Sequence, residues 1–367
     1  MRQYLSKIPR STEELLKWYE KYISPLSLLV GFTIDNIVLK RVDLFWGNML
    51  LFGYLAAAAG GIVLYHLIQS GRLRGKFFLW LLPFTTIVIQ FGFGGLFSGF
   101  VILYSHSAAY ATSWIFVLIL AVLMIGNERF RARYSSFVFQ STILFVALTS
   151  FMLFFLPVIF GRIGTSMFVL SQVVSVAVIV GFVYLFRYVA PEVLRGTQLT
   201  LLKSAASIVL IFNVLYFTNA IPPLPLALKD AAVVHRVERI GTEFRLTREP
   251  QTWYQKHLWF DEVYHRTRGE PVYVYTAVFA PTRLSTTILH EWEYFDDQSN
   301  SWVQSGTFGF QITGGRDGGY RGYSLKEQTE EGKWRVNVKT GSGQLIGRIS
   351  FDVEQVDTKA TTQVEKR

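Results

Sequence analysis

The sequence contains no cysteine. Disulfide bonds, thiolate metal sites and cysteine nucleophiles are therefore excluded. Several catalytic motifs are also missing: there is no G-x-S-x-G, no H-E-x-x-H, no Walker lysine loop and no G-x-G-x-x-G opening a helix after a strand. The sequence therefore predicts no catalytic residues, no cofactor and no metal.

Charged residues are scarce between residues 22 and 220, where long apolar runs dominate. From residue 229 onward the composition is mixed and polar. Residues 1–219 hold 17 Lys and Arg against 7 Asp and Glu, whereas residues 220–367 hold 19 of each. Because the basic excess belongs to the apolar half, no basic face is expected on a soluble domain, and we predict no nucleic-acid partner.

The composition predicts a membrane domain followed by a soluble domain. The first segment combines a capping box, Ser11 with Glu14, and an apolar stripe at helical spacing. A plain solvated helix is the alternative to one lying on the membrane surface. The predicted parts are a cytoplasmic amphipathic helix (1–22), a transmembrane helical domain (23–219), a linker with strands and a short helix (220–266), a β-sandwich (267–357) and a tail (358–367).

About seven spans are predicted, since a transmembrane helix needs roughly 20 apolar residues. The candidates are 23–39, 44–68, 77–92, 96–125, 137–160, 166–186 and 198–219. Residues 93–95 are interpreted as an outer turn, and the small residues of 92–99 as suited to close helix packing. The span 96–125 is interpreted as either one long helix after this turn or two pieces. Residues 1–21 have no apolar core of signal-peptide length, so the first span is expected to act as an uncleaved insertion signal.

Basic residues predict the orientation of these spans. With a cytoplasmic N-terminus, the inner stretches hold 14 Lys and Arg and the outer stretches hold three, which agrees with the positive-inside rule. An odd number of passes places the C-terminal domain on the outer face. We therefore expect a multi-pass protein of the bacterial inner membrane with a periplasmic C-terminal domain.

Asp35 lies inside the first apolar run, where a carboxylate must face protein, water or a partner. We predict a polar cluster near the outer surface, in which Asn36, Arg41 and Asn48 bind Asp35. A packed helix–helix contact is favoured over an ion, proton or substrate site. His106, between two serines, is likewise interpreted as a packing residue rather than a proton carrier.

The last third of the chain shows the rhythm of short antiparallel strands. Their alternation of apolar and polar residues predicts an all-β, immunoglobulin-like antiparallel sandwich. The predicted strand segments are 232–246 (strand, turn, strand), 271–280, 286–296, 301–313, 319–328, 332–340 and 344–356.

Two interpretations of the aromatic residues on these strands remain open. Stripes such as Ile288, His290, Trp292 and Tyr294 are interpreted as core, the usual role of such residues. The alternative is an exposed binding platform like those of sugar-binding sandwiches. Its candidate residues are Tyr294, Trp302, Tyr320 and Tyr323, with Arg316 and Arg321 as polar partners.

Residues 252–266 are predicted to be helical. His257, Asp261 and His265 would then share one helical face. A solvated stripe is favoured over a metal site, because three residues without a fourth ligand nearby rarely hold a metal.

Two groups of strings carry a resemblance to a known family. The strings GGRDGGYRGYSLKEQTEEGKWRVNVKTGSGQLIGRISFDV and HEW resemble the C-terminal domain of bacterial membrane proteins grouped as a domain of unknown function, type 2914. GFTIDNIVLKRVD, NERFRARY and LPVIFGRIG resemble the membrane half of the same proteins. The resemblance implies a multi-pass envelope protein ending in a β-rich module and implies no activity. It favours an architectural role for Asp35, beside Arg41 and Asp43.

Three functions remain as hypotheses. The leading one is a non-enzymatic integral membrane protein whose outer β-sandwich binds an envelope partner, either glycan or protein. The first alternative is a transporter or channel that uses Asp35 and His106. The second is an enzyme that acts on lipid-linked substrates through Asp35, Asp43 or His290. The oligomeric state is left open.

Overall fold

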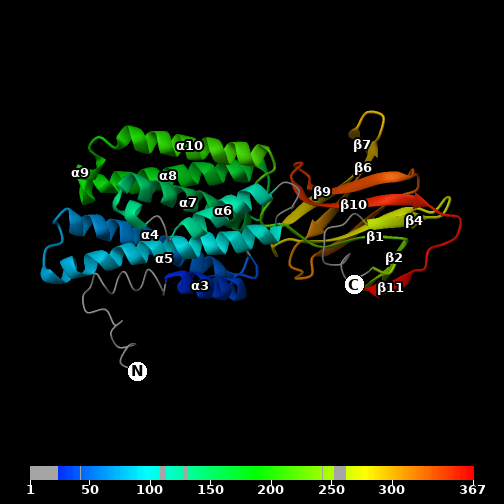
Figure 1. The fold of residues 1–367 in the computed structure, drawn as a ribbon, viewed down its shortest axis with the longest axis horizontal. Helices are drawn as coiled ribbons and strands as arrows, with labels where there is room; N and C mark the ends of the chain where they lie inside the picture. Colours follow the sequence, from blue (N-terminus) through cyan, green and yellow to red (C-terminus); the bar gives the residue numbers. More distant parts are fainter. Residues whose placement is uncertain (1–23, 42, 108–112, 128–130, 242, 252–261) are drawn as a thin grey trace, which may run out of the picture. The chain divides into compact units, whose positions relative to one another are not determined.

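The computed structural model describes residues 24–41, 43–107, 113–127, 131–241, 243–251 and 262–367 (Figure 1). The chain divides into two compact units. One consists of helices, and the other holds the β-strands together with short segments around residues 106–114 and 157–167. The predicted amphipathic helix 1–22 lies outside the described residues.

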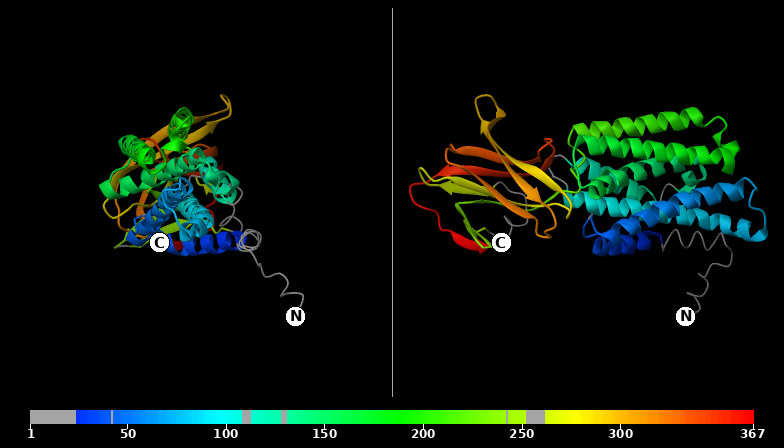
Figure 2. Two further views of the ribbon diagram at one scale, coloured as in Figure 1. Left: turned by 90° about the vertical axis from the view of Figure 1, so that its left-hand side faces the viewer. Right: turned by 180° about the vertical axis from the view of Figure 1, so that it is seen from behind.

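Within the described residues of the first unit, five helices are long and apolar enough to cross a membrane. They run side by side in both views of Figure 2, and their composition indicates a membrane protein. The five are α4 (Phe45–Gln69), α5 (Lys76–Ser107), α7 (Phe137–Phe160), α8 (Thr165–Val189) and α10 (Gln198–Phe217). The shorter elements are α3 (Ser24–Val38), α6 (Trp114–Gly126), α9 (Pro191–Leu194) and the 3₁₀-helix η2 (Arg131–Ser135).

Large apolar side chains remain exposed on the outer helices of this unit. Leu202 and Leu210 of α10 are 66% and 64% exposed, and Val180 of α8 is 60% exposed. The interior is aromatic instead, with Phe93, Phe100 and other rings fully buried. An apolar surface of this kind is expected to lie against lipid rather than water.

The predicted turn at residues 93–95 is wrong, because α5 continues through this segment without a break. Its glycines do allow the close helix packing that their composition predicted. A Cβ on Gly92 would lie 2.7 Å from the Tyr54 carbonyl oxygen, and one on Gly95 would lie 2.6 Å from the Tyr54 ring. The glycines therefore bring α4 and α5 together, as small residues do between membrane helices.

The predicted span 96–125 corresponds to two helices. Its first part is the end of α5, and its second part is α6, which begins at Trp114. Residues 108–112 lie outside the described residues.

The β-unit contains three sheets. Sheet A has the order β1-β5-β8, sheet C has β4-β10-β9-β6-β7, and sheet B has β11-β3-β2. The strands are β1 (Ala227–Val234), β2 (Arg236–Ile240), β3 (Glu243–Arg248), β4 (Glu262–Arg266), β5 (Val272–Phe279), β6 (Ser285–Asp296), β7 (Ser301–Thr313), β8 (Tyr320–Lys326), β9 (Gly332–Thr340), β10 (Leu345–Gln355) and β11 (Gln363–Lys366).

Sheet A is the middle layer of the β-unit. Successive residues of a strand point to opposite faces. On β1, Val233 packs with Trp292 of sheet C, whereas the neighbouring Val234 packs with Leu246 of sheet B. Strand β5 is accordingly buried along nearly its whole length. The core therefore has two parts, one on each face of sheet A.

The six strands predicted between 271 and 356 are confirmed, and so is the core role of Ile288, His290 and Trp292, which are fully buried. The helix predicted for 252–266 is wrong at its end, since residues 262–266 form β4, which pairs with β10 in parallel. The antiparallel sheets thus include one parallel pair. Strands β1 and β4 also lie outside 267–357, and β11 falls in the predicted tail.

Candidate functional site

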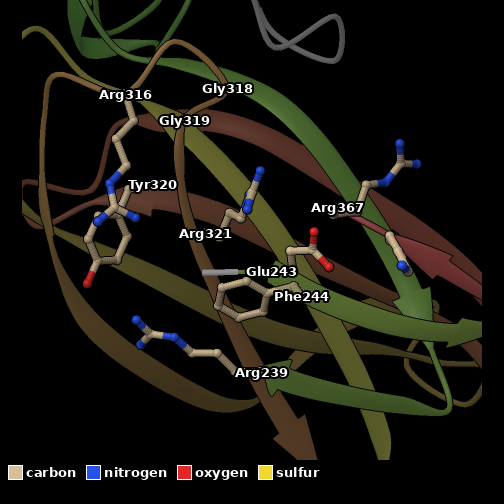
Figure 3. Close-up of a pocket in the computed structure, with 10 residues that line it drawn as sticks. Arg239, Glu243, Phe244, Arg316, Gly318, Gly319, Tyr320, Arg321 and Arg367 are labelled. Atoms are coloured by element: carbon tan, nitrogen blue, oxygen red, sulfur yellow. The ribbon is translucent and has the colours of Figure 1, made fainter. Parts of the chain in front are cut away.

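A basic pocket of about 610 Å³ lies on the face of sheet A that sheet B partly covers (Figure 3). Three pieces of chain that are distant in sequence line it: the β2–β3 hairpin, the end of β11, and the turn from β7 into β8. The lining residues are Arg239, Glu243, Phe244, Arg316, Gly318, Gly319, Tyr320, Arg321, Lys366 and Arg367.

The register of β8 places Arg321 in this pocket. Residues paired directly across antiparallel strands point to the same face. Arg321 pairs with Ala277 of β5, and Ala277 packs against Phe244 and Leu246 of sheet B. Arg321 therefore lies on the face of sheet A that sheet B partly covers, and the pocket forms between its side chain and the hairpin.

The turn before β8 depends on a glycine. Gly319 has φ +83°, and a Cβ there would lie 2.9 Å from the Val278 carbonyl carbon. This left-handed backbone and this close approach both favour glycine. The amide of Gly319 donates to the Arg316 carbonyl oxygen at 3.0 Å. The tight turn leaves Arg316 exposed, with its guanidinium 5.4 Å from the centroid of the Tyr320 ring.

Positive charge dominates the pocket wall, where five Arg and Lys side chains face one carboxylate, Glu243. Arg367 is already paired, with its Nε 3.0 Å from the Asp230 carboxylate. Arg239 lies over the Phe244 ring at 5.9 Å. Burial raises the pKa of Tyr275, behind Arg321 and Arg367, to about 12, so this phenol stays neutral. The surplus of cations favours an anionic ligand.

The described part of the chain holds no group of His, Asp and Glu side chains arranged to bind a metal ion. The pocket instead offers guanidinium groups, which bind carboxylate and phosphate oxygens in pairs. Tyr320 and Phe244 also line the pocket, but the Phe244 side chain is buried in the core and the Tyr320 ring packs against the core on the other face of sheet A.

The predicted platform residues fall into two places. Three of the six predicted residues, Arg316, Tyr320 and Arg321, lie together at the pocket. Tyr323 is exposed on the same face of β8, with its ring 6.1 Å from that of Tyr273.

Trp302 and Tyr294 lie on sheet C instead. The Trp302 ring is covered by the Arg335 guanidinium at 4.1 Å, and the Tyr294 ring packs 5.6 Å from that of Trp334.

Five pocket residues escaped the sequence analysis: Arg239, Glu243, Phe244, Lys366 and Arg367. They lie in segments interpreted as linker and tail. The hairpin that carries Arg239, Glu243 and Phe244 was predicted at 232–246, but nothing in it indicated a site. The alternation in QVEK, residues 363–366, is too short to predict a strand.

Asp35 is buried at 2% exposure between three helices. It accepts hydrogen bonds from the Tyr54 hydroxyl of α4 at 3.1 Å and from the Ser98 hydroxyl of α5 at 2.6 Å. The predicted partner Arg41 instead forms a two-point ion pair with Asp43, at 2.9 and 2.7 Å. The predicted Asp35–Arg41 contact is therefore wrong. Arg41 reaches Asp43, two residues along the chain, more easily than Asp35 on another side of the helix.

The other predicted intramembrane residues are not joined to Asp35 in the structure. Asn36 is exposed, and the Asn48 amide donates to the Leu44 carbonyl oxygen at 3.0 Å. His106 is exposed in the last turn of α5.

His290 is fully buried in the β-unit core. Its ring nitrogens contact the hydroxyls of Thr276 and Ser324, each at 2.9 Å. Burial lowers the pKa of His290 to about 4, so the ring is neutral at pH 7. It therefore acts as a hydrogen-bonded core residue without access to a substrate.

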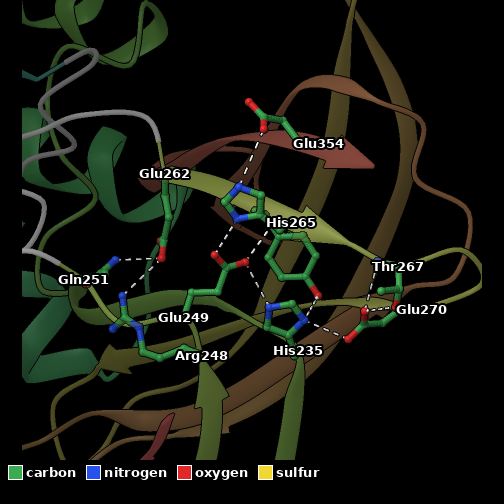
Figure 4. Close-up of polar contacts among 10 residues, drawn as sticks. His235, Arg248, Glu249, Gln251, Glu262, His265, Thr267, Glu270 and Glu354 are labelled. Carbon is green, nitrogen blue, oxygen red and sulfur yellow. Dashed lines mark hydrogen bonds and ion pairs between the residues drawn. The ribbon is translucent and has the colours of Figure 1, made fainter. Parts of the chain in front are cut away.

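A second polar site surrounds His235, which directly precedes β2 (Figure 4). Its ring lies between the carboxylates of Glu249 and Glu270. Glu249 also contacts His265 Nδ1 at 2.7 Å. His265 belongs to β4, while its predicted companions His257 and Asp261 lie outside the described residues.

Comparisons with known proteins support only a family of unassigned function. Residues 285–353 match the family model described as "Protein of unknown function (DUF2914)". This range spans β6 to β9 and most of β10, which supports a C-terminal domain of unknown function. No curated protein matches the chain.

Among solved structures, the chain is similar to the Pseudomonas fluorescens alkylpurine DNA glycosylase AlkC bound to DNA containing an abasic site analog. The identity is 9%, the alignment covers 86% of this chain and 99% of that chain, and the TM-score is 0.23. A similarity this low carries no argument about fold or function.

Proposed function

We propose that this protein is a non-enzymatic membrane anchor for an outer β-domain that binds an acidic envelope glycan. In this proposal seven helices cross the bacterial inner membrane, the N-terminus is cytoplasmic, and the β-domain lies in the periplasm. The five span-length helices and the distribution of basic residues support the membrane half.

One observation carries the choice of ligand: the basic pocket, in whose wall five Arg and Lys side chains face one carboxylate. The carboxylates of an acidic sugar would pair with Arg316 and Arg321. A protein partner is less well matched, because a pocket of about 610 Å³ suits a small ligand or one end of a polymer.

The binding test uses the full chain in detergent or nanodiscs. The probe is a tetramer of galacturonic acid, and a neutral maltotetraose is the comparison. We expect calorimetric binding of the acidic tetramer alone, weakening as salt is added. Each charge-assisted hydrogen bond contributes about 1.5–3 kcal/mol, so R321A and R316A should each weaken binding roughly tenfold or more.

R236A is the matched control. Arg236 is exposed, pairs with Glu238 at 2.8 Å and does not line the pocket. Its loss should leave the affinity unchanged. Equal binding of both tetramers, or equal effects of R236A and R321A, would contradict the proposal.

Topology is tested separately. A reporter that is active only outside the cytoplasm should be active when fused after Arg367 and silent when inserted in 127–136. The opposite pattern would reverse the assignment of every loop.

A carrier or channel remains the second candidate, and the burial of Asp35 among three helices favours it. It predicts that D35N changes flux in reconstituted vesicles while the protein folds normally; unchanged flux would exclude a role for this carboxylate. The enzyme hypothesis gains no support, since His290 is enclosed in the core and Asp43 is paired with Arg41.

A further inference from the structure

Both ring nitrogens of His235 face a carboxylate. Nδ1 lies 2.8 Å from Glu270 Oε1, and Nε2 lies 3.2 Å from Glu249 Oε1. Only the protonated ring donates from both nitrogens, because a neutral imidazole has one donor and one acceptor. The His235 side chain is 8% exposed, so water is a poor substitute for either partner. The geometry therefore selects the imidazolium form.

The surroundings hold this arrangement in place. The Tyr264 ring stacks on His235 with centroids 4.4 Å apart, and its hydroxyl lies 3.1 Å from Nδ1. Glu270 also accepts from the Thr267 hydroxyl at 2.6 Å and the Thr267 amide at 3.2 Å. Glu249 accepts from the His265 amide at 2.9 Å.

Other charged groups lie in a second ring around this contact. The Arg266 guanidinium donates to the backbone carbonyls of Glu270, Glu327 and Thr329. His265 Nε2 lies 3.7 Å from Glu354, and Arg248 contacts Glu262 and Glu365 at 3.4 and 3.3 Å. The Tyr273 phenol also acts electrostatically on Tyr264. Glu249 is shared between His235 and the His265 ring, whose Nδ1 lies 2.7 Å from Glu249 Oε2, whereas Glu270 contacts His235 and Thr267.

The pKa values agree with the geometry. Burial acts to lower the pKa of His235, but the hydrogen bonds and charges of Glu249 and Glu270 outweigh it, and the net direction is upward. The change of charge is thereby moved to a pH above the usual value of about 6.5.

The contact sits at one end of the β2–β3 hairpin, and the pocket sits at the other. His235 directly precedes β2 and Glu249 directly follows β3, and the His235 amide donates to the Thr247 carbonyl oxygen at 2.8 Å. Arg239 near the end of β2 and Phe244 near the start of β3 line the pocket. The hairpin therefore connects the histidine with the ligand site.

We propose that His235 is a proton-binding site that fastens the base of the β2–β3 hairpin and thereby sets the pH range in which the pocket holds its ligand. With the proton bound, His235 contacts Glu249 at the end of the hairpin and Glu270 in the segment before β5, and so links the two. Once the proton leaves, one carboxylate faces a nitrogen lone pair and that link opens. The coupling to the pocket rests on the proposed function; the proton site does not.

The first experiment needs no ligand. Hydrogen exchange of hairpin residues 236–248 is measured on the full chain from pH 5.5 to 9.5 and corrected for the intrinsic rates. We expect protection at low pH that falls about tenfold or more through one midpoint above 6.5. H235Q should lack protection at every pH. E270Q removes one carboxylate, so its midpoint should move down by about one pH unit or more.

R236A, which leaves the histidine contacts intact, is the control and should behave as the wild type. Protection that does not vary with pH, or an unchanged midpoint in E270Q, overturns the proton site. If H235Q does not fold, the E270Q midpoint alone decides.

The second experiment measures the affinity for the galacturonic acid tetramer over the same pH range. It should fall several-fold through the midpoint seen by exchange, and this step should be displaced in E270Q. Affinity that stays constant while protection falls overturns the coupling alone. Absence of binding at every pH overturns the proposed function and the coupling with it, while the exchange result still decides the proton site.

Discussion

Substituting Gly95 in α5 by alanine should destabilise the helical unit, although alanine is the better helix former. The added Cβ would lie 2.6 Å from two atoms of the Tyr54 ring, which is well inside van der Waals contact. The ring cannot move freely, since its hydroxyl donates to the buried Asp35 carboxylate at 3.1 Å. Relief of the clash therefore separates α4 from α5 or breaks this hydrogen bond.

Two unfavourable contributions and one favourable contribution determine the change in the free energy of unfolding. Overpacking a core typically costs about 1–3 kcal/mol. A lost hydrogen bond to a charged group costs about 1.5–3 kcal/mol. Replacing Gly by Ala inside a helix returns about 1 kcal/mol. When the clash both overpacks the interface and breaks the hydrogen bond, the net loss for G95A is roughly 1.5–5 kcal/mol.

G53A is the matched control, because Gly53 lies in α4 and a Cβ there meets nothing within 4 Å. The assay is the apparent melting temperature of the full chain in detergent, followed by loss of the monodisperse peak on size exclusion. G95A should melt several degrees below the wild type, and G53A should melt at or above it. If G95A melts no lower than G53A, the close α4–α5 packing through Tyr54 is refuted.

Three further predictions concern the β-unit, each checked by melting the full chain and following the tryptophan signal. Burial acts to raise the pKa of Glu249, but hydrogen bonds from His235 and His265 lower it to about 2. The stabilisation that this carboxylate gives the folded protein is therefore complete above about pH 4.5 and is lost as pH falls toward 2. E249Q should reduce the loss of stability over this pH range. His290 is neutral when folded, so its contribution to the stability of the protein is lost as pH falls from 6.5 through about 4. H290L should remove this pH dependence. It should also lower the stability at pH 7 by roughly 1–3 kcal/mol for each hydroxyl left without a partner. G319A should destabilise the protein by roughly 1–3 kcal/mol, because residue 319 has a left-handed backbone and its Cβ would contact β5. G318A should have much less effect, since a Cβ there meets nothing within 4 Å. Equal effects of the two substitutions would contradict the tight turn.

The sequence predicted what depends on neighbouring residues. Alternation along 332–340 places Trp334, Val336 and Val338 on one face, and all three are buried. Apolar runs of span length likewise predicted the long helices. Both signals are periodic, so a short window of sequence is enough to detect them.

Features set by distant contacts could not be predicted in this way. The partners of Asp35 are 19 and 63 residues away in sequence, whereas the sequence suggested the nearby Arg41. The glycines at 92–95 were predicted both to form a turn and to suit close helix packing; they are helical, and the helix they pack against is α4.

The basic pocket shows the same limit. Arg239, Arg321 and Lys366 come from three strands whose pairing no local pattern reveals. Arg316, Tyr320 and Arg321 were recognised because they follow one another along a single strand and its turn.

The pairing of β11 with β3 has a practical consequence for anyone who purifies or labels this protein. Lys366 and Arg367 form part of the pocket wall, and the Arg367 amide donates to the Phe244 carbonyl oxygen at 2.9 Å. Any tag joined after Arg367 therefore leaves from the rim of the pocket. An acidic epitope tag in that position would reach five cationic side chains at very high local concentration and compete with added glycan. Ligand screens are better served by a tag at the other end of the chain or by one that is cleaved before use.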